Sequence, residues 1–280
     1  MAENKIKWPN GARCAVMYSF DFDGETIFND GPEGKDWEWP RSLSYGRYGP
    51  NRGVWHILNL LNQYNIKATF FVPARTAIQY PEQVRAIDLD GHEVALHGFE
   101  HESILGALSS DEQVAHIRRC QDVFRKIIGK EAKGFRCPSG DYNETLAFNL
   151  WDEGLMYSSS LRGDDRPYRV DFGQGETDFI EISNKLNIDD YPQFVYQYFP
   201  ELPDSQDRIA HYRTVLDNWC REFDGYYKEG LCYVIMCHPL ISGTPGRVQM
   251  HEKLIKHMKE YDDVWFATGS EIAKWWRENY

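Results

Sequence analysis

Four short polar segments, each beside an apolar run, contain the residue types that could do chemistry in this chain. They cover residues 19–23, 97–101, 136–140 and 236–239. Together they offer a pair of aspartates, two histidines at i and i+4, an arginine and a further histidine. Metal ligands, a general base and a general acid are the groups that a hydrolytic metalloenzyme needs. The sequence therefore indicates a metal-dependent hydrolase.

The carboxylate pair follows a predicted strand. Residues 15–20 form a mostly apolar run, typical of a fully buried strand, that leads into Asp21 and Asp23. Because side chains alternate along a strand, both carboxylates point to the same side if the strand persists. Two buried anions this close are costly unless neutralised, and a divalent cation on Asp23 with an arginine near Asp21 would do so. The alternative is that both aspartates merely begin a polar loop, since Gly24 and Glu25 follow.

His97 and His101 would share one face of a helical turn whether or not a metal is bound. Residues 91–96 are typical of a glycine turn followed by a short buried strand, which would deliver His97 to the C-terminal edge of a sheet, where α/β proteins keep their sites. With the upstream carboxylates, this favours a ligand pair over exposed or capping histidines.

An arginine and a third histidine complete the set. Arg136 lies in an apolar turn, where an unpaired guanidinium would be costly, so a functional role is favoured over an ordinary surface arginine. His238 ends the apolar run 231–237, which predicts another buried strand. A satisfied core histidine remains the alternative for His238.

The order of these motifs resembles the polysaccharide deacetylase (NodB-homology) family. The motifs are Phe-Asp-x-Asp, His-Gly-x-x-His, Arg-x-Pro-x-Gly and His-Pro, and the resemblance covers residues 9–276. More narrowly, residues 55–61, 91–93 and 157–168 resemble the branch that holds intracellular allantoinase-like and cyclic-imide-hydrolase-like enzymes and proteins named peptidoglycan deacetylases.

The resemblance implies that Asp23, His97 and His101 bind one divalent metal ion, with zinc expected. Three protein ligands leave positions open for water and the substrate carbonyl, as a catalytic site requires. It also implies that Asp21 is the general base that takes a proton from that water.

Further roles follow from the same resemblance. Arg136 would orient Asp21 and keep it ionised. His238 would be the general acid that protonates the departing nitrogen. The backbone N–H of Ser139, next to Pro138, would help stabilise the tetrahedral oxyanion.

The chain also departs from the family pattern. Ser139 replaces a tyrosine that is common in polysaccharide-active members, and Ser158 stands where the branch often has an aspartate. A carboxylate that orients His238 must therefore come from elsewhere, and Asp164 and Asp165 are the nearest candidates in this sequence.

Length and patterning predict an α/β fold. With 280 residues, 42% of them hydrophobic, residues 1–280 can form one large domain, and no Pro/Gly/Ser linker divides them. Apolar runs predict strands at 15–20, 68–72, 94–96, 134–135, 232–237 and 264–267. Helical patterns are clearest at 111–128 and 207–227. The alternation favours a mostly parallel sheet, which the resemblance narrows to a distorted or incomplete (β/α) barrel with the site on its C-terminal face.

Charge and the N-terminal residues exclude several classes of partner. The net charge of −12, without a basic stripe, makes nucleic acid and anionic membranes poor partners. The first nine residues contain no apolar signal segment and no stretch reaches transmembrane length, so we expect a cytoplasmic protein. The six cysteines lack metal-ligand spacing and are expected to be reduced packing residues.

Two aromatic-rich segments, 26–51 and 183–204, are predicted loop insertions that shape the substrate pocket. They could cover the site, or bury themselves against a neighbouring subunit, since the resemblance implies a homo-oligomer, a tetramer in related enzymes. The alternative is that their aromatic residues fold onto their own barrel.

These features favour hydrolysis of the C–N bond of a small amide, cyclic imide or ureide, because a polymer strand needs an open groove and an exported enzyme. One alternative is removal of N-acetyl groups from amino-sugar polymers such as peptidoglycan or chitin. A second alternative is a catalytically silent carbohydrate- or metal-binding protein, although binding alone would not require both a base and an acid.

Overall fold

The computed structural model describes residues 6–28, 40–102, 105–138, 142–173, 176–195 and 209–280. Nine strands in these residues form one curled sheet in the order β6-β7-β5-β4-β3-β2-β1-β8, with β9 beside the first residues of β1. All pairings are parallel except β6 with β7. The strands are β1 Cys14–Asp21, β2 Thr69–Val72, β3 Glu93–Leu96, β4 Gly134–Phe135, β5 Tyr157–Ser158, β6 Tyr168–Asp171, β7 Glu176–Glu181, β8 Cys232–Cys237 and β9 Val264–Phe266.

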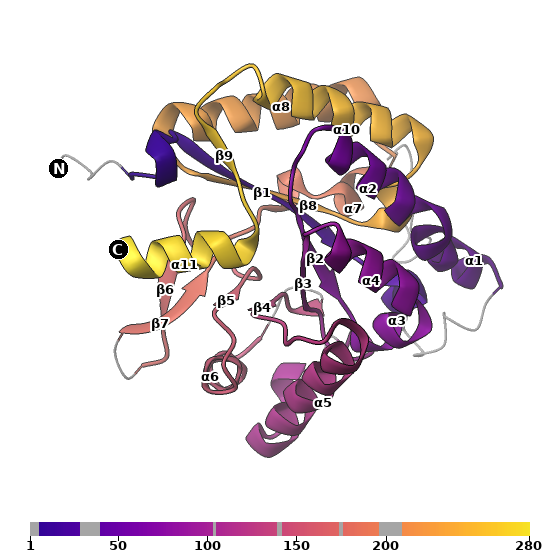
Figure 1. Ribbon diagram of the computed structural model, residues 1–280, viewed down its shortest axis with the longest axis vertical. Helices are drawn as coiled ribbons and strands as arrows, with labels where there is room; N and C mark the ends of the chain where they lie inside the picture. The colour runs from indigo at the N-terminus through magenta and orange to yellow at the C-terminus, as the bar shows by residue number, and fades with distance from the viewer. Residues whose placement is uncertain (1–5, 29–39, 103–104, 139–141, 174–175, 196–208) are drawn as a thin grey trace, which may run out of the picture.

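Helices surround this sheet (Figure 1), which makes the fold an incomplete (β/α) barrel, as predicted. An isolated parallel bridge between Asp189 and Met236 joins the segment after β7 to β8 and brings the two ends of the sheet together. The helices are α1 Pro40–Tyr48, α2 Val54–Gln63, α3 Ala74–Gln79, α4 Pro81–Leu89, α5 Ser110–Ile128, α6 Glu144–Asp152, α7 Asp190–Phe194, α8 Tyr212–Glu229, α9 Pro239–Ser242, α10 Pro245–Met258 and α11 Gly269–Asn279. No helix in the described ranges is long and apolar enough to cross a membrane.

The alternation of side chains along β1 explains where the polar site lies. Val16 and Phe20 belong to the core that the sheet shares with the outer helices, whereas Ala15 and Met17 belong to a second core on the inner face. Residues of α11 fill that second core. The same alternation places Asp21 on the inner face, at the end of β1 that is remote from α11. The inner face is thus apolar at one end of the strands and polar at the other.

The strongest sequence patterns lie close to the observed elements. The pattern at 111–128 corresponds to α5, which Ser109 and Glu112 begin with a reciprocal capping box and Gly129, at φ 74°, ends. The pattern at 207–227 corresponds to α8, which begins at Tyr212. The sequence patterns did not predict β5, β6 and β7, because each of these strands mixes polar with apolar residues and none forms an apolar run.

The two predicted insertions are not irregular throughout. Residues 26–51 include α1, and residues 183–204 include α7. Gly46 of α1 packs so closely on the backbone of Glu25 that an added Cβ would lie 2.7 Å from it, which ties this helix to the chain after β1. Several aromatic residues of these segments lie outside the described residues, namely Trp37, Trp39, Tyr196, Tyr198 and Phe199.

Candidate metal and catalytic site

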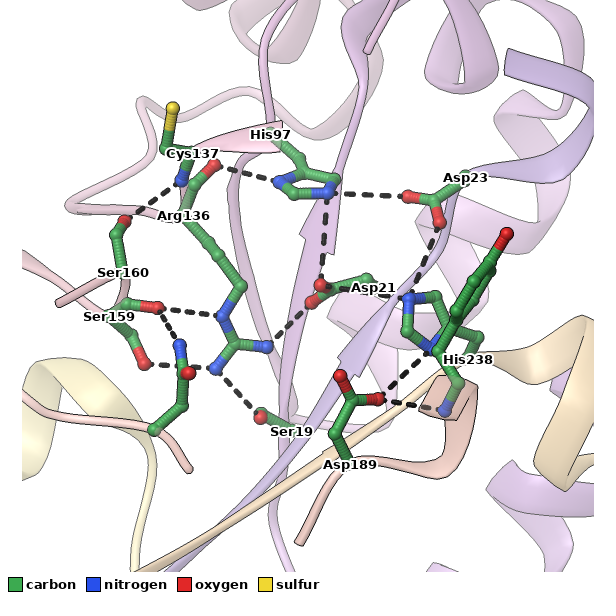
Figure 2. Close-up of polar contacts among 12 residues, drawn as sticks. Ser19, Asp21, Asp23, His97, Arg136, Cys137, Ser159, Ser160, Asp189 and His238 are labelled. Carbon is green, nitrogen blue, oxygen red and sulfur yellow. Dashed lines mark hydrogen bonds and ion pairs between the residues drawn. The ribbon is translucent and has the colours of Figure 1, made fainter. Parts of the chain in front are cut away.

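The predicted site residues converge because neighbouring parallel strands end at the same edge of the sheet. Asp21 ends β1, Asp23 follows it, His97 follows β3, Arg136 follows β4 and His238 follows β8. Figure 2 shows the carboxylates, the imidazoles and the guanidinium turned toward one another across these strand ends.

Asp23, His97 and His101 are brought together as the predicted ligand set. One potential ligand atom from each lies within 4.8 Å of the others, and all three side chains are buried. Neither oxygen of Asp23 has a hydrogen-bond partner among the described residues. A buried carboxylate without such partners is costly, so this site fits a cation.

The orientation of His97 supports the same fit. Its Nδ1 lies 2.7 Å from the backbone oxygen of Arg136, and because a carbonyl only accepts, Nδ1 carries the proton. The lone pair of Nε2 then faces Asp23 Oδ1 at 3.5 Å. Burial lowers the pKa of His97 despite the nearby carboxylates of Asp21 and Asp23. A neutral imidazole whose lone pair faces a carboxylate can bind, together with that carboxylate, a cation that lies between them.

The loop that carries His101 is built by a residue that the sequence reading did not single out. Both carboxylate oxygens of Glu102 accept backbone hydrogen bonds, from Phe99 N and Glu100 N, each at 2.9 Å. His101 has φ 62°, a left-handed conformation that is uncommon for a residue with a side chain. The turn thereby places the ring centroids of His97 and His101 5.0 Å apart. A tight loop, and not a helical turn, therefore brings His97 and His101 together at their i,i+4 spacing.

Asp21 lies in a different environment from Asp23. Its Oδ1 accepts a hydrogen bond from Arg136 Nη1 at 2.6 Å, while its Oδ2 lies 3.7 Å from His97 Nε2 and 4.0 Å from His238 Nε2. Burial raises the pKa of Asp21, but the charge of Arg136, with a further contribution from His238 and the hydrogen bond from Arg136, outweighs it and lowers the pKa overall. Asp21 is thus an ionised carboxylate with one oxygen anchored and the other facing the site.

Arg136 is held rigidly from several directions. Nε donates to the backbone oxygen of Ser159, and Nη2 donates to the hydroxyl oxygens of Ser159 and Ser19, at 2.9 to 3.0 Å. Its guanidinium carbon lies 4.0 Å from the centroid of the Phe71 ring. With 2% of its surface exposed, this arginine is a fixed part of the core rather than a surface residue.

His238 is oriented by Asp190, and the sequence reading that offered Asp164 and Asp165 for this role was wrong. His238 Nδ1 lies 2.7 Å from Asp190 Oδ1, and the backbone N of His238 donates to Asp190 Oδ2 at 2.9 Å. Asp164 instead pairs with Arg166 and Asp165 accepts from a tyrosine. The bridge that brings the segment after β7 beside β8 places Asp190, at the start of α7, next to His238.

The charges around His238 favour its protonated form. Burial alone would lower the pKa of His238, but Asp190, Asp23 and Asp189 outweigh it and raise the pKa to about 10. Asp189, Asp190 and His238 also form a second group whose ligand atoms lie within 4.8 Å. Both Asp190 oxygens in that group are already used as hydrogen-bond acceptors, which does not favour a metal there.

The predicted oxyanion turn is only partly visible. Ser139 lies outside the described residues, and Pro138 is buried against Gly98, where an added Cβ would lie 3.2 Å from the proline ring. Cys137 N donates to Ser160 Oγ at 2.9 Å, which anchors the start of this turn. The oxyanion role of Ser139 stays a prediction.

Comparison with known proteins shows what this chain is similar to in sequence and fold. Residues 28–157 match the sequence profile of the polysaccharide deacetylase family. A peptidoglycan deacetylase from Helicobacter pylori is 26% identical over 92% of this chain and 94% of its own length. The allantoinase PuuE shares the fold, with a TM-score of 0.81 at 20% identity over 99% of this chain and 95% of its own.

A solved structure of higher identity completes the comparison. A Mycobacterium smegmatis protein described as a polysaccharide deacetylase superposes with a TM-score of 0.88 at 30% identity, over 99% of this chain and 95% of its own. The family resemblance inferred from the motifs is thereby confirmed. The chain belongs to the polysaccharide deacetylase family, whose members include deacetylases, which are hydrolases that act on amide C–N bonds.

Proposed function

We propose that this protein is a metal-dependent hydrolase that cleaves the C–N bond of a small amide, cyclic imide or ureide. The observation that supports a small substrate is the burial of the reactive groups. Their exposed fractions are 4% for Asp21, 0% for Asp23, 2% for His97, 8% for His101 and 7% for His238. Enclosed polar groups suit a compact substrate better than a polymer strand, which needs an open groove.

Asp23, His97 and His101 would hold the metal ion in this proposal. One oxygen and two imidazole nitrogens suit zinc, with positions left open for the substrate. When bound, the ion would polarise the substrate carbonyl and stabilise developing negative charge. The oxygens of Asp23 that have no hydrogen-bond partner among the described residues support this assignment.

The residues around the ion would perform the proton transfers. Oδ2 of Asp21 faces the site and would accept a proton from the attacking water, while Arg136 holds Oδ1 and keeps the carboxylate in place. His238 carries one proton on Nδ1, toward Asp190, and its raised pKa supports a second on Nε2 at neutral pH. That Nε2–H would protonate the departing nitrogen, which avoids expelling an unstable amide anion.

The ring of Tyr191 would limit the room for a substrate beside the acid. Its centroid lies 5.4 Å from the centroid of the His238 ring. An aromatic ring at this position would pack against a flat imide or ureide ring while His238 reaches the nitrogen. The same ring would obstruct an extended polysaccharide.

One observation favours a second candidate, deacetylation of an amino-sugar polymer. The Helicobacter pylori relative that matches nearly the whole chain is a peptidoglycan deacetylase. That reaction would use the same base, acid and metal ligands, so the two candidates differ in substrate size and not in chemistry.

A hydrolysis screen of the zinc-loaded protein would separate these functions. We expect turnover of at least one compound among cyclic imides, allantoin, hydantoins and N-acetylated monosaccharides, with little acetate released from chitin or peptidoglycan. Asp21→Asn in the same preparation is the control for contaminating activity. Efficient polymer deacetylation without turnover of any small amide would establish the second candidate. No turnover at all, with metal bound, would favour a silent binding protein. Size-exclusion chromatography of the same sample would test the predicted homo-oligomer.

A further inference from the structure

A chain of buried hydrogen bonds continues behind His238, away from the proposed site. Beyond Asp190, it runs through Ser242 and His251 to Tyr18. Ser242 Oγ lies 2.5 Å from Asp190 Oδ2, His251 Nε2 lies 2.8 Å from Ser242 Oγ, and Tyr18 Oη lies 2.5 Å from His251 Nδ1. The residues belong to α7, α9, α10 and β1, so the chain ties four separate elements together.

The chemistry of the groups fixes the direction of each bond. A carboxylate only accepts, so the single proton of the Ser242 hydroxyl is donated to Asp190. Ser242 must then accept from His251, which places the proton of that imidazole on Nε2. His251 Nδ1 is consequently an acceptor, and the hydroxyl of Tyr18 donates to it. Only one arrangement of protons satisfies every member of the chain.

The surroundings keep this arrangement in place. Tyr18, Ser242 and His251 have 1%, 0% and 2% of their surfaces exposed, and the ring of Trp219 packs 5.7 Å from that of His251. Burial lowers the pKa of His251 to about 4, which keeps the imidazole neutral near neutral pH. A buried polar group without its partner would be costly in this environment. The chain therefore resists any rotation of the Asp190 side chain.

We propose that Tyr18, Ser242 and His251 are positioning residues that hold Asp190 in the rotamer that aims His238 Nε2 into the site. Among the described residues, their side chains make no hydrogen bond to the predicted metal ligands and are linked to the ring of His238 through Asp190. This inference rests on the proposed role of His238 as the general acid. It goes beyond that role because it assigns functional residues on the outer face of β1, opposite the face that carries Asp21.

Two substitutions at His251 distinguish positioning from simple packing. His251→Leu removes both nitrogen atoms, whereas His251→Gln keeps a side-chain N–H that can donate to Ser242. On a substrate found in the amide screen, we expect His251→Leu to lower kcat by about 10- to 100-fold with KM unchanged, the range for a lost hydrogen bond in a charged network. His251→Gln should recover most of that loss. Equal kcat losses in the two variants, or a wild-type kcat for His251→Leu, would overturn the proposal.

Tyr18→Phe tests the far end of the chain against a matched control. Tyr233 is equally buried and lies on the adjacent strand β8. Its hydroxyl donates to the backbone oxygen of Trp219, which is not a member of the hydrogen-bond chain. Tyr18→Phe should lower kcat by about 2- to 10-fold, the net value of one neutral hydrogen bond, while Tyr233→Phe should not lower kcat. An equal decrease in both variants would show that only core packing is at work.

A spectroscopic measurement tests the chain without any substrate. In ¹⁵N NMR spectra of the histidine-labelled, zinc-loaded protein, we expect His251 to be neutral with its proton on Nε2. A proton on Nδ1 of His251, or a charged ring, would refute the assigned direction whatever the activity. A protein that shows the expected tautomer but hydrolyses no amide would instead contradict the proposed function alone.

Discussion

The two sides of the candidate site differ in how their buried charged groups are hydrogen-bonded. On the Arg136 side, the guanidinium makes four hydrogen bonds of 2.6 to 3.0 Å, to Asp21, Ser19 and Ser159. On the Asp23 side, two fully buried carboxylate oxygens have no hydrogen-bond partner among the described residues. The two aspartates are separated by one residue of the same strand end.

The two sides therefore differ in whether protein groups alone neutralise the buried charges. The Arg136 side satisfies its own charges, so it is preorganised for catalysis by the protein alone. The Asp23 side carries a cost that a bound cation would relieve. A base must be held in place but keep one oxygen for the proton, whereas a metal ligand must keep its oxygens for the ion. The protein surroundings therefore distinguish the two carboxylates where their spacing does not.

The largest effect is expected at Asp23. Asp23→Asn should abolish stoichiometric metal binding and reduce turnover below detection, because it weakens the oxygen ligand. The metal-free variant should nevertheless be about 1 to 3 kcal/mol more stable than the metal-free wild type, since a neutral amide replaces a buried carboxylate without hydrogen-bond partners. Elemental analysis and urea unfolding measure both quantities. Full metal content in Asp23→Asn would contradict the assigned ligand set.

Asp21→Asn should behave in the opposite way. It should retain the metal ion, because Asp21 is not part of the ligand set, yet lose on the order of 10²- to 10⁴-fold in kcat, the usual contribution of a general base. Elemental analysis alongside steady-state kinetics provides the check. Metal loss in Asp21→Asn combined with metal retention in Asp23→Asn would mean that the two roles are exchanged.

Arg136→Met should break the preorganised side. It leaves Asp21 as a buried carboxylate without its partner, so we expect the free energy of unfolding to fall by about 3 to 5 kcal/mol. The double variant Arg136→Met with Asp21→Asn should recover part of that loss, because no isolated charge then remains. Urea unfolding of the three variants measures the coupling. Strictly additive losses would show that the ion pair is not what stabilises this side.

Glu181 supports the Arg136 side and gives a pH-dependent test. Its Oε1 accepts from Ser160 N and Leu161 N, next to the serine that holds the guanidinium. Burial raises the pKa of Glu181 from 4.5 to about 7, against the hydrogen bonds that lower it. Because the folded state binds the proton more tightly, the contribution of Glu181 to stability is full below about pH 4.5 and is lost as the pH rises to about 7.

Glu181→Gln should remove this dependence. The difference in unfolding free energy between wild type and variant should shift in favour of the variant by up to about 3 kcal/mol between pH 4.5 and pH 8. Thermal or urea unfolding of both proteins across that range measures it. A difference that does not change with pH would show that Glu181 is not protonated in the folded protein.

The sequence by itself determined the strands that carry the candidate site and the residues at their ends. Apolar runs predicted β1 and β8 closely, and both are fully buried strands. Parallel strands end at one edge of a sheet, and the family resemblance implied that Asp21, Asp23 and His238, which follow such runs, share one site there. Local hydrophobic patterns carry this information because burial of a strand depends mainly on its own side chains.

Only the tertiary structure decided which polar groups pair. Asp190 orients His238 because one bridge brings the segment after β7 beside β8, and no local pattern in 183–204 marks that contact. Glu102 shapes the loop of His101 by accepting hydrogen bonds from the backbone N–H groups of Phe99 and Glu100. These bonds depend on the conformation of the loop, which the local sequence does not specify. Pairings of this kind depend on register and on loop closure between distant segments, and these are set by the whole fold rather than by the residues nearby.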